Sequence, residues 1–269
     1  MFRRIIDDFR TELRKPTIYF NFSGEPTLNK ALPDMIAYAT VHGHDTFVST
    51  NATKLSEDMA ERLIRAGLGR IALCMDGFSK EAQEAYRVGS QFAAVKANIE
   101  LFCAAKQRLR AKNPITVLQT LLTSYSETQI DEIRHWAIQH GFDRIRFKTF
   151  SLGSHTSPEM RVAHSHFLPK DQSLRRHENA RESVLCTSPL SQTVVFWSGD
   201  LGLCCIDYDQ VVRLPNVMEH GFLTAYRSDE AARARRRGFA RQFKICQSCS
   251  YSNADKLGFI VRLDPSGAA

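Results

Sequence analysis

Apolar residues in the first 150 positions follow two patterns that alternate along the chain. Short runs rich in β-branched and aromatic residues predict strands, and apolar residues repeating every three or four positions predict helices with one buried stripe. The predicted strands are 17–21, 46–50, 70–75, 115–122 and 144–150. The predicted helices are 2–13, 29–42, 56–67, 80–86, a long one around 92–102, and 126–141.

Several helix ends carry their own signals. Ser56 is expected to cap one helix, and Ser126 with Gln129 has the spacing of a capping box for another. The apolar stripe of the first helix is expected to run from Phe2 to Leu13. These signals support the helix boundaries independently of the apolar pattern.

Strands that alternate with helices indicate βα units and a parallel sheet, so the fold class is α/β, either an open barrel or a doubly wound sheet. The first predicted element is a helix, 2–13, with no strand before it. We therefore expect that the chain begins partway into its fold, and that one sheet edge lacks its partner strand.

The alternation weakens after residue 150. Residues 151–185 are expected to form a connector, and the four histidines His42, His44, His164 and His166 are expected to lie at the surface. The last third is rich in cysteine and includes a predicted hairpin, with a turn at 198–200. Three regions follow: a βα domain at 1–150, the connector at 151–185 and a cysteine-rich domain at 186–269.

The turn after the first predicted strand is the first candidate for chemistry. It reads Asn21-Phe22-Ser23-Gly24-Glu25-Pro26-Thr27-Leu28, at the sheet edge where α/β proteins bind ligands. Gly24 permits close approach of the backbone, and the carboxylate of Glu25 suits a ligand ammonium or hydroxyl group. The alternative is an ordinary βα turn.

The cysteines are the second candidate. Five of the seven follow position 185, and Cys246 and Cys249 form a C-x2-C pair. With Cys186 and one of the adjacent Cys204 and Cys205, they supply four soft ligands. Zinc and a [4Fe–4S] cluster both suit such a set. The remaining cysteines, Cys74 and Cys103, are expected in the core.

Composition narrows the class of protein. The chain of 269 residues is 43% hydrophobic and 24% charged, with a net charge of +7. No apolar run is long enough for a membrane span, and the odd number of cysteines favours a reducing cytoplasm over a disulfide framework. The densest basic run, 233–237, lacks interleaved aromatics and favours a solvated helix face over nucleic-acid binding.

These features together resemble the radical S-adenosylmethionine (SAM) superfamily, in particular members with a C-terminal SPASM or twitch-type iron–sulfur domain. Ser23-Gly24-Glu25-Pro26 resembles the Gly-Gly-Glu-Pro motif for the methionyl amino group. Ser49-Thr50-Asn51 and Cys74-Met75-Asp76-Gly77 resemble two further SAM segments. The SPASM signature C-x9–15-G-x4-C…C-x2-C is matched by Cys186, Gly199, Cys204, Cys246 and Cys249.

The resemblance implies a partial (βα)6 TIM-like barrel without its first strand, followed by a small SPASM/twitch-type domain. It implies a SAM site and an auxiliary [4Fe–4S] cluster, with a catalytic [4Fe–4S] cluster only in a full-length form. The SAM-binding residues would be Gly24, Glu25, Pro26, Ser49, Asn51 and Arg87. The metal ligands would be Cys186, Cys204, Cys246 and Cys249.

The sequence departs from the family pattern in three ways. The C-x3-C-x2-C motif of the catalytic cluster is absent, so no catalytic residue is assigned. Cys74 stands where the family often has Ser, and Ser23 where it has Gly. The closing C-x5-C-x3-C of the SPASM signature is missing, so one auxiliary cluster is expected.

Three functions remain open from sequence. The first is a radical SAM/SPASM enzyme that forms a 5′-deoxyadenosyl radical to modify a peptide or protein, inactive as this chain, with ferredoxin or flavodoxin as electron donor. The second is a non-catalytic module that binds a metal or cluster and recognises a partner peptide. The third, an RNA-modifying enzyme, depends on the basic run alone. No membrane partner is expected.

Overall fold

A computed structural model describes residues 1–150, 152, 157–175, 185–247, 249 and 258–263. The chain divides into two compact units. Unit 1 contains 1–15, 153–157 and 178–254, and unit 2 contains 16–152, 158–177 and 255–269. The two are described separately below.

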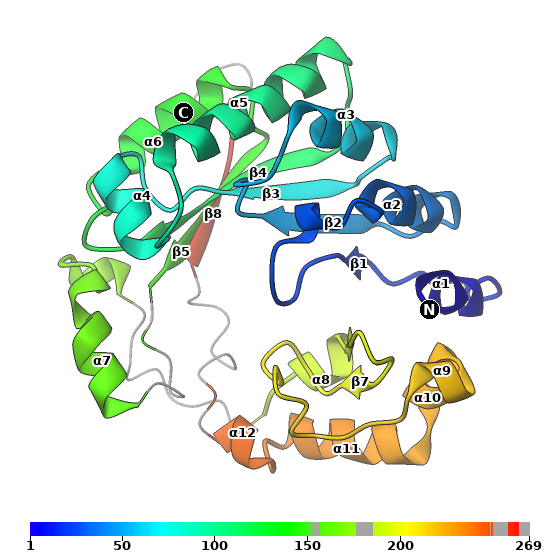
Figure 1. The fold of residues 1–269 in the computed structure, drawn as a ribbon. Helices are drawn as coiled ribbons and strands as arrows, with labels where there is room; N and C mark the ends of the chain where they lie inside the picture. Colours follow the sequence, from blue (N-terminus) through cyan, green and yellow to red (C-terminus); the bar gives the residue numbers. More distant parts are fainter. Residues whose placement is uncertain (151, 153–156, 176–184, 248, 250–257, 264–269) are drawn as a thin grey trace. The chain divides into compact units, whose positions relative to one another are not determined.

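Unit 2 is built on a six-stranded sheet in the order β1-β2-β3-β4-β5-β8 (Figure 1). Neighbouring strands from β1 to β5 are parallel, and β8 pairs antiparallel with β5. The strands are β1 (Ile18–Tyr19), β2 (Thr46–Thr50), β3 (Arg70–Cys74), β4 (Ile115–Leu122), β5 (Arg144–Thr149) and β8 (Gly258–Arg262). The first five confirm the predicted strands, whereas β8 was not predicted.

Helices cover one face of this sheet (Figure 1). They are α2 (Leu32–Val41), α3 (Glu57–Arg65), α4 (Lys80–Tyr86), α5 (Phe92–Arg108) and α6 (Ile130–Gln139). Alternate strand residues such as Val48, Ile71, Leu118 and Ile145 are fully buried in one core with these helices. Because side chains alternate along a strand, the residues between them lie on the opposite face, which we call the helix-free face.

Two predicted helix caps differ in outcome. Ser56 accepts a hydrogen bond from the backbone N–H of Met59 at 3.2 Å, which confirms it as the cap of α3. The capping box predicted for Ser126 and Gln129 is wrong. Gln129 Oε1 instead accepts from the N–H of Phe78 at 2.8 Å, and Ser126 Oγ donates to Leu121 O at 2.9 Å. Gln129 therefore serves a partner distant in sequence and Ser126 bonds the end of β4, so neither side chain caps α6.

Residues 158–175, which follow β5, also belong to unit 2. Their elements are α7 (Pro158–His164) and the short 3-10 helices η2 (Ser165–Phe167) and η3 (Gln172–Leu174), and a third 3-10 turn, η1 (Pro26–Leu28), follows β1. Residues 151, 153–156 and 176–184 of the predicted connector lie outside the described residues.

Unit 1 has a hairpin and a set of short helices around their own core. The hairpin is β6 (Val194–Val195) with β7 (Leu201–Gly202), antiparallel as predicted. The helices are α1 (Phe2–Asp8), α8 (Ser188–Ser191), α9 (Val217–His220), α10 (Phe222–Arg227), α11 (Asp229–Phe239) and α12 (Lys244–Gln247). Leu201, Leu203, Val217 and Ala231 are buried in this core.

The first helix belongs to unit 1. The Asp8 carboxylate accepts a hydrogen bond from Phe222 N, and the rings of Phe9 and Phe222 lie 5.1 Å apart. The helix ends at Asp8, and Leu13 is fully exposed, so the predicted stripe to Leu13 is wrong. The helix therefore packs on α10. The boundaries at 150 and 185 between the three regions predicted from the sequence stay predictions.

No helix in the described ranges has both the length and the apolar character that crossing a bilayer requires.

One carboxylate joins the starts of β4 and β5. Asp143 Oδ2 accepts from Thr116 N at 2.7 Å, Thr116 Oγ1 at 2.8 Å and Lys106 Nζ at 2.8 Å. Burial alone would raise the pKa of Asp143. The hydrogen bonds outweigh that effect, and the pKa lies below its ordinary value of 3.8.

We therefore predict a pH-dependent contribution from Asp143. A lowered folded pKa gives stabilisation that is complete above the unfolded pKa and is lost as the pH falls through the folded pKa. Asp143→Asn should lower the free energy of unfolding at neutral pH. Because the variant has no carboxylate to protonate at this position, its free energy of unfolding should fall less than that of wild type as the pH drops below about 4. Urea unfolding at several pH values measures this. The control is Asp131→Asn, whose side chain is 96% exposed and meets Arg134 only at 3.7 Å, and it should change the free energy of unfolding by less than about 0.5 kcal/mol. Equal pH profiles for Asp143→Asn and wild type would contradict the prediction.

Candidate functional site

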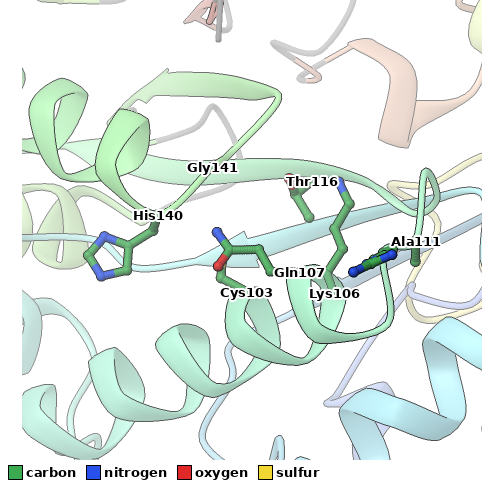
Figure 2. A pocket seen from close by; sticks show the side chains of 8 residues that line it. Cys103, Lys106, Gln107, Ala111, Thr116, His140 and Gly141 are labelled. Carbon is green, nitrogen blue, oxygen red and sulfur yellow. The ribbon is translucent and has the colours of Figure 1, made fainter.

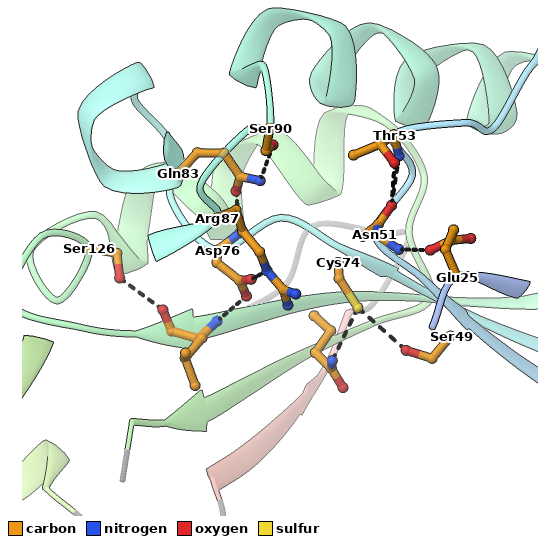
Figure 3. Close-up of polar contacts among 12 residues, drawn as sticks. Glu25, Ser49, Asn51, Thr53, Cys74, Asp76, Gln83, Arg87, Ser90 and Ser126 are labelled. Carbon is orange, nitrogen blue, oxygen red and sulfur yellow. Dashed lines mark hydrogen bonds and ion pairs between the residues drawn. The ribbon is translucent and has the colours of Figure 1, made fainter. Parts of the chain in front are cut away.

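The carboxylate of Glu25 ties the turn after β1 to the end of β2 (Figure 3). Its Oε1 accepts from Thr27 N at 3.0 Å, Thr27 Oγ1 at 2.6 Å and Thr50 Oγ1 at 2.6 Å. Its Oε2 accepts from Asn51 N at 2.8 Å. The sequence predicted that this carboxylate serves a ligand. The structure shows that Oε1 is fully used within the protein, so only Oε2 keeps acceptor capacity.

Gly24 and Pro26 give this turn its shape. Gly24 has φ +90°, a conformation that disfavours any residue with a Cβ, although a Cβ there would meet no atom within 4 Å. Pro26 opens the 3-10 turn η1, whose N-cap is Glu25. Gly24 is exposed, so the backbone at this turn is accessible.

Ser49 and Asn51 lie at the end of β2 but make different contacts. Asn51 Oδ1 accepts from Thr53 N at 3.0 Å and Thr53 Oγ1 at 2.7 Å, which closes a local turn. Ser49 Oγ lies 3.4 Å from Cys74 Sγ on the helix-free face. The structure thus brings Glu25, Ser49 and Asn51 to one rim of the sheet.

Arg87 forms an ion pair at the end of β3 (Figure 3). Its Nε lies 2.5 Å from Oδ2 of Asp76, a residue only 2% exposed, and Asp76 Oδ1 accepts from Leu121 N at 3.0 Å. Burial alone would lower the pKa of Arg87, but Asp76 outweighs it and the pKa is raised. Arg87 therefore stays charged at the rim, with one N–H committed to Asp76.

Cys74 and Cys103 are both buried, which confirms the prediction that they belong to the core. Gln119 Nε2 donates to Cys74 Sγ at 3.2 Å, and burial, with Asp76 second, raises the pKa of this thiol. Burial raises the pKa of Cys103 to about 12. Both thiols are therefore neutral near pH 7 and poor nucleophiles.

The hairpin of unit 1 presents Cys204 and Cys205 just after β7. Gly199 forms its turn with φ +93°, and a Cβ there would lie 2.7 Å from Asn216 Oδ1. Asn216 Nδ2 donates to Ser198 O at 3.1 Å and Asp200 Oδ1 at 3.0 Å. The glycine of the cysteine signature is therefore required where the 216–220 segment packs on the hairpin.

Arg241 fixes the C-x2-C pair. Its guanidinium donates to Cys246 O at 2.6 Å and to Cys249 O at 3.0 Å. The N–H of Cys249 donates to Cys246 O at 3.3 Å. One guanidinium group thus binds the backbone carbonyl groups of both cysteines of the pair.

The five late thiols lie close enough to affect one another's ionisation. Burial, followed by Cys205 and Cys246 among its charged neighbours, raises the pKa of Cys204 to about 11. Burial also raises the pKa of Cys205, where Cys249 and Cys186 add to the effect. Both adjacent cysteines therefore remain candidate ligands, and Gln192 Nε2 donates to Cys205 Sγ at 3.4 Å.

The donor set suits a soft metal centre, because thiolates are the usual ligands of zinc and iron–sulfur clusters. Among the described residues, no group of three or more His, Cys, Asp or Glu side chains stands in geometry that could hold a metal ion. The late thiols lie near one another, but in the described part of the chain they do not form a coordination sphere. The ligand assignment to Cys186, Cys204, Cys246 and Cys249 stays a prediction.

Two cavities lie in unit 2, apart from the rim residues predicted above. One of about 180 Å³ is shown in Figure 2. It is lined by Cys103, Lys106, Gln107, Arg110, Ala111, Thr116, His140 and Gly141. The other, of about 640 Å³, is lined by Glu81, Ser124, Tyr125, Ser165, His166, Leu168 and Lys170.

The predicted surface position holds for His164 and His166, which are exposed. It is wrong for His44, which is 4% exposed and has Nδ1 at 2.9 Å from Pro16 O. His42 is partly buried, with Nδ1 at 2.8 Å from Tyr38 O. The sequence offered no signal for these backbone partners.

Comparison with known families gives two matches. The radical SAM superfamily model matches residues 1–137, and the SPASM model, described as an iron–sulfur cluster-binding domain, matches 186–250. These are the families that the residues resembled. They imply the predicted cofactors, SAM and [4Fe–4S] clusters, but do not assign residues to them.

Curated relatives match part of the chain. Fe-coproporphyrin III synthase of Methanosarcina barkeri is 35% identical over 32% of this chain and 21% of the relative. The tungsten-containing aldehyde ferredoxin oxidoreductase cofactor-modifying protein of Pyrococcus furiosus is 26% identical over 53% of this chain and 40% of the relative. Mycofactocin maturase MftC of Mycobacterium ulcerans is 28% identical over 51% of this chain and 35% of the relative. The matches thus span less than half the length of these relatives.

Solved structures share the fold. Streptococcus suis SuiB bound to S-adenosylmethionine has a TM-score of 0.63 at 15% identity, covering 95% of this chain and 66% of that chain. Native anSMEcpe with bound AdoMet has a TM-score of 0.59 at 15% identity, covering 96% and 79%. These likenesses confirm the predicted α/β fold.

We predict that Glu25→Gln destabilises unit 2. The new amide NH2 would take the place of one carboxylate oxygen and leave a donor facing a donor, either at Asn51 N or at the two threonines. The free energy of unfolding should fall by about 1–3 kcal/mol, the usual cost of an unsatisfied polar group. Urea unfolding measures this. The exposed Glu132→Gln is the matched control and should change it by less than about 0.5 kcal/mol. Equal stability of the two variants would contradict the assigned role of Glu25.

Proposed function

The chain belongs to the radical SAM superfamily, and on that premise we propose that it forms part of an enzyme that modifies a peptide or protein. In this proposal SAM binds at the rim formed by the ends of β1, β2 and β3, and the late cysteines hold an auxiliary iron–sulfur cluster. Relatives named as a maturase and as a cofactor-modifying protein support a modifying reaction.

The observation that carries the proposal is the set of fixed polar groups at this rim. Glu25 Oε2 receives one hydrogen bond, from Asn51 N, and can accept another from the ammonium of SAM. Arg87 keeps further N–H groups beyond the one that meets Asp76, and these suit a carboxylate. Gly24, Pro26 and Ser49 complete the proposed SAM contacts.

The proposed cluster ligands are Cys186, Cys204, Cys246 and Cys249. A [4Fe–4S] cluster, when bound, supplies one-electron transfer. The protein's own part is to hold the thiols together, through the hydrogen bonds of Arg241 to the carbonyl groups of Cys246 and Cys249. Ferredoxin or flavodoxin is the proposed class of electron donor.

A second candidate is a non-catalytic module that binds a metal or cluster and recognises a partner peptide. The 269 residues contain no C-x3-C-x2-C motif, and the fusion experiment described below separates the two candidates. RNA modification is not proposed. Arg235 lies 3.9 Å from the Tyr226 ring centroid and Arg237 lies 4.5 Å from that of Phe243, so both stack within the chain.

Metal analysis tests the cluster. After anaerobic reconstitution with iron and sulfide, we predict about four iron atoms per chain and a brown protein. Cys246→Ala with Cys249→Ala should lose this iron, because the chelating pair is removed. Cys103→Ala, a change at a buried core thiol, should retain it. A colourless protein with one zinc per chain, or equal iron in all variants, would contradict the assignment.

Reductive cleavage of SAM tests the catalytic part. With a strong reductant we predict no 5′-deoxyadenosine from the 269-residue chain. The same chain fused to an amino-terminal segment that carries C-x3-C-x2-C should produce it after cluster loading. No product from the loaded fusion would contradict a SAM-cleaving enzyme and favour the binding module. Product from the chain alone would show that the proposed inactivity is wrong.

A further inference from the structure

Strand β5 carries cations on one face only. It reads Arg144-Ile145-Arg146-Phe147-Lys148, and both Ile145 and Phe147 are fully buried in the core beneath the helices. Because side chains alternate along a strand, the three cations lie on the helix-free face. All three are partly buried.

The neighbours of these cations on the same face bring no negative charge. On β4 the residues in register with Arg144, Arg146 and Lys148 are Val117, Gln119 and Leu121. On β8 they are Arg262, Ile260 and Gly258. Arg144 therefore stands directly opposite Arg262, and like charges in that arrangement destabilise a sheet.

These four cations have no partner within the described part of the chain. Arg144, Arg146, Lys148 and Arg262 make no side-chain hydrogen bond or ion pair there. The nearby acid, Asp76, is already paired with Arg87. Burial lowers the pKa of Lys148, and Arg146 and Arg87 lower it further against the opposing effects of Cys74 and Asp76. The cations thus repel one another, and a bound anion would relieve that repulsion.

We propose that this cationic strip, Arg144, Arg146, Lys148 and Arg262, binds an extended acidic segment of the peptide substrate. The inference rests on the proposed function, because it names the chemistry of that peptide. Residues two apart on a strand are separated by about 6.6–6.8 Å, on β5 and on an extended peptide alike. Carboxylates at alternate peptide positions therefore match the spacing of Arg144, Arg146 and Lys148.

The geometry favours a peptide over SAM as the occupant. The proposed SAM residues lie at the ends of β1 to β3, whereas β5 is two strands beyond β3, about 9–10 Å away. SAM has one carboxylate, but the strip presents four cations along two strands. An acidic peptide supplies enough negative charge to meet several of them.

Peptide binding tests this proposal without any cluster chemistry. The probe is a fluorescein-labelled peptide amide, Gly-Glu-Ser-Glu-Ser-Glu-Gly, compared with the same peptide carrying Gln for every Glu. Fluorescence anisotropy at low salt measures the affinity. We expect the Glu peptide to bind about tenfold more tightly, the sum of several modest ion pairs, and to weaken as salt is added.

Two triple variants separate the strip from general electrostatic attraction. Arg144→Gln, Arg146→Gln and Lys148→Gln should together weaken binding of the Glu peptide about tenfold. The control replaces three exposed cations of unit 1, at Arg233, Arg236 and Lys244, by Gln and removes the same charge. It should change the affinity by less than about twofold. Equal losses in the two variants, or equal binding of the Glu and Gln peptides, would overturn the proposal.

A stability measurement guards against misfolded variants. The single change Arg144→Gln removes the repulsion with Arg262, so it should raise the melting temperature at low salt. A lowered melting temperature would overturn the repulsion on which the strip depends. Displacement of the bound peptide by SAM would also overturn the proposal, by assigning the strip to the cofactor.

The proposed function and the strip fail in different ways. A loaded fusion protein that does not cleave SAM, but binds the Glu peptide through β5, would reject the catalytic proposal and keep the strip. SAM cleavage with no preference between the Glu and Gln peptides would reject the strip alone.

Discussion

The rim of unit 2 depends on one partly buried set of hydrogen bonds, those to the carboxylate of Glu25. They join a turn that follows β1 to the end of β2, two segments about 25 residues apart in sequence. Without them the turn that contains Gly24 would lose this link to β2, and Asn51 would lose the acceptor for its backbone N–H. A charged acceptor that receives several hydrogen bonds is strong enough for this task. Arg87, the rim residue at the end of β3, is held separately by its ion pair with Asp76.

The same principle operates in unit 1. Asp207 is completely buried, and its carboxylate accepts from Val211 N at 2.7 Å and Val212 N at 3.3 Å, which fixes the loop after Cys204 and Cys205. Arg241 does the equivalent for the C-x2-C pair with the opposite charge. In each unit, therefore, side chains with carboxylate or guanidinium groups make hydrogen bonds to the backbone of an irregular loop beside the residues of a proposed cofactor site.

The sequence predicted what local patterns determine. Strands 46–50 and 115–122 were found at their observed bounds because their β-branched and apolar residues are bracketed by turn residues. The rim was found because Gly24 and its neighbours form a motif. The pairing of β8 with β5, the buried position of His44 and the link from Gln129 to Phe78 were missed. Each depends on a partner distant in sequence, and a single chain does not encode such pairings as a periodic pattern. The cations of β5 were visible as an alternation, but only the register showed that no acid faces them.

Hydrogen exchange measured by mass spectrometry tests whether the ends of β1 to β3 bind SAM. With SAM added in excess, we expect slower exchange of the backbone amides in the segments 23–28 and 49–53, with no change in α6 at the helix-covered face. No slowing in those two segments, or slowing confined to other parts of unit 2, would contradict SAM binding at these strand ends.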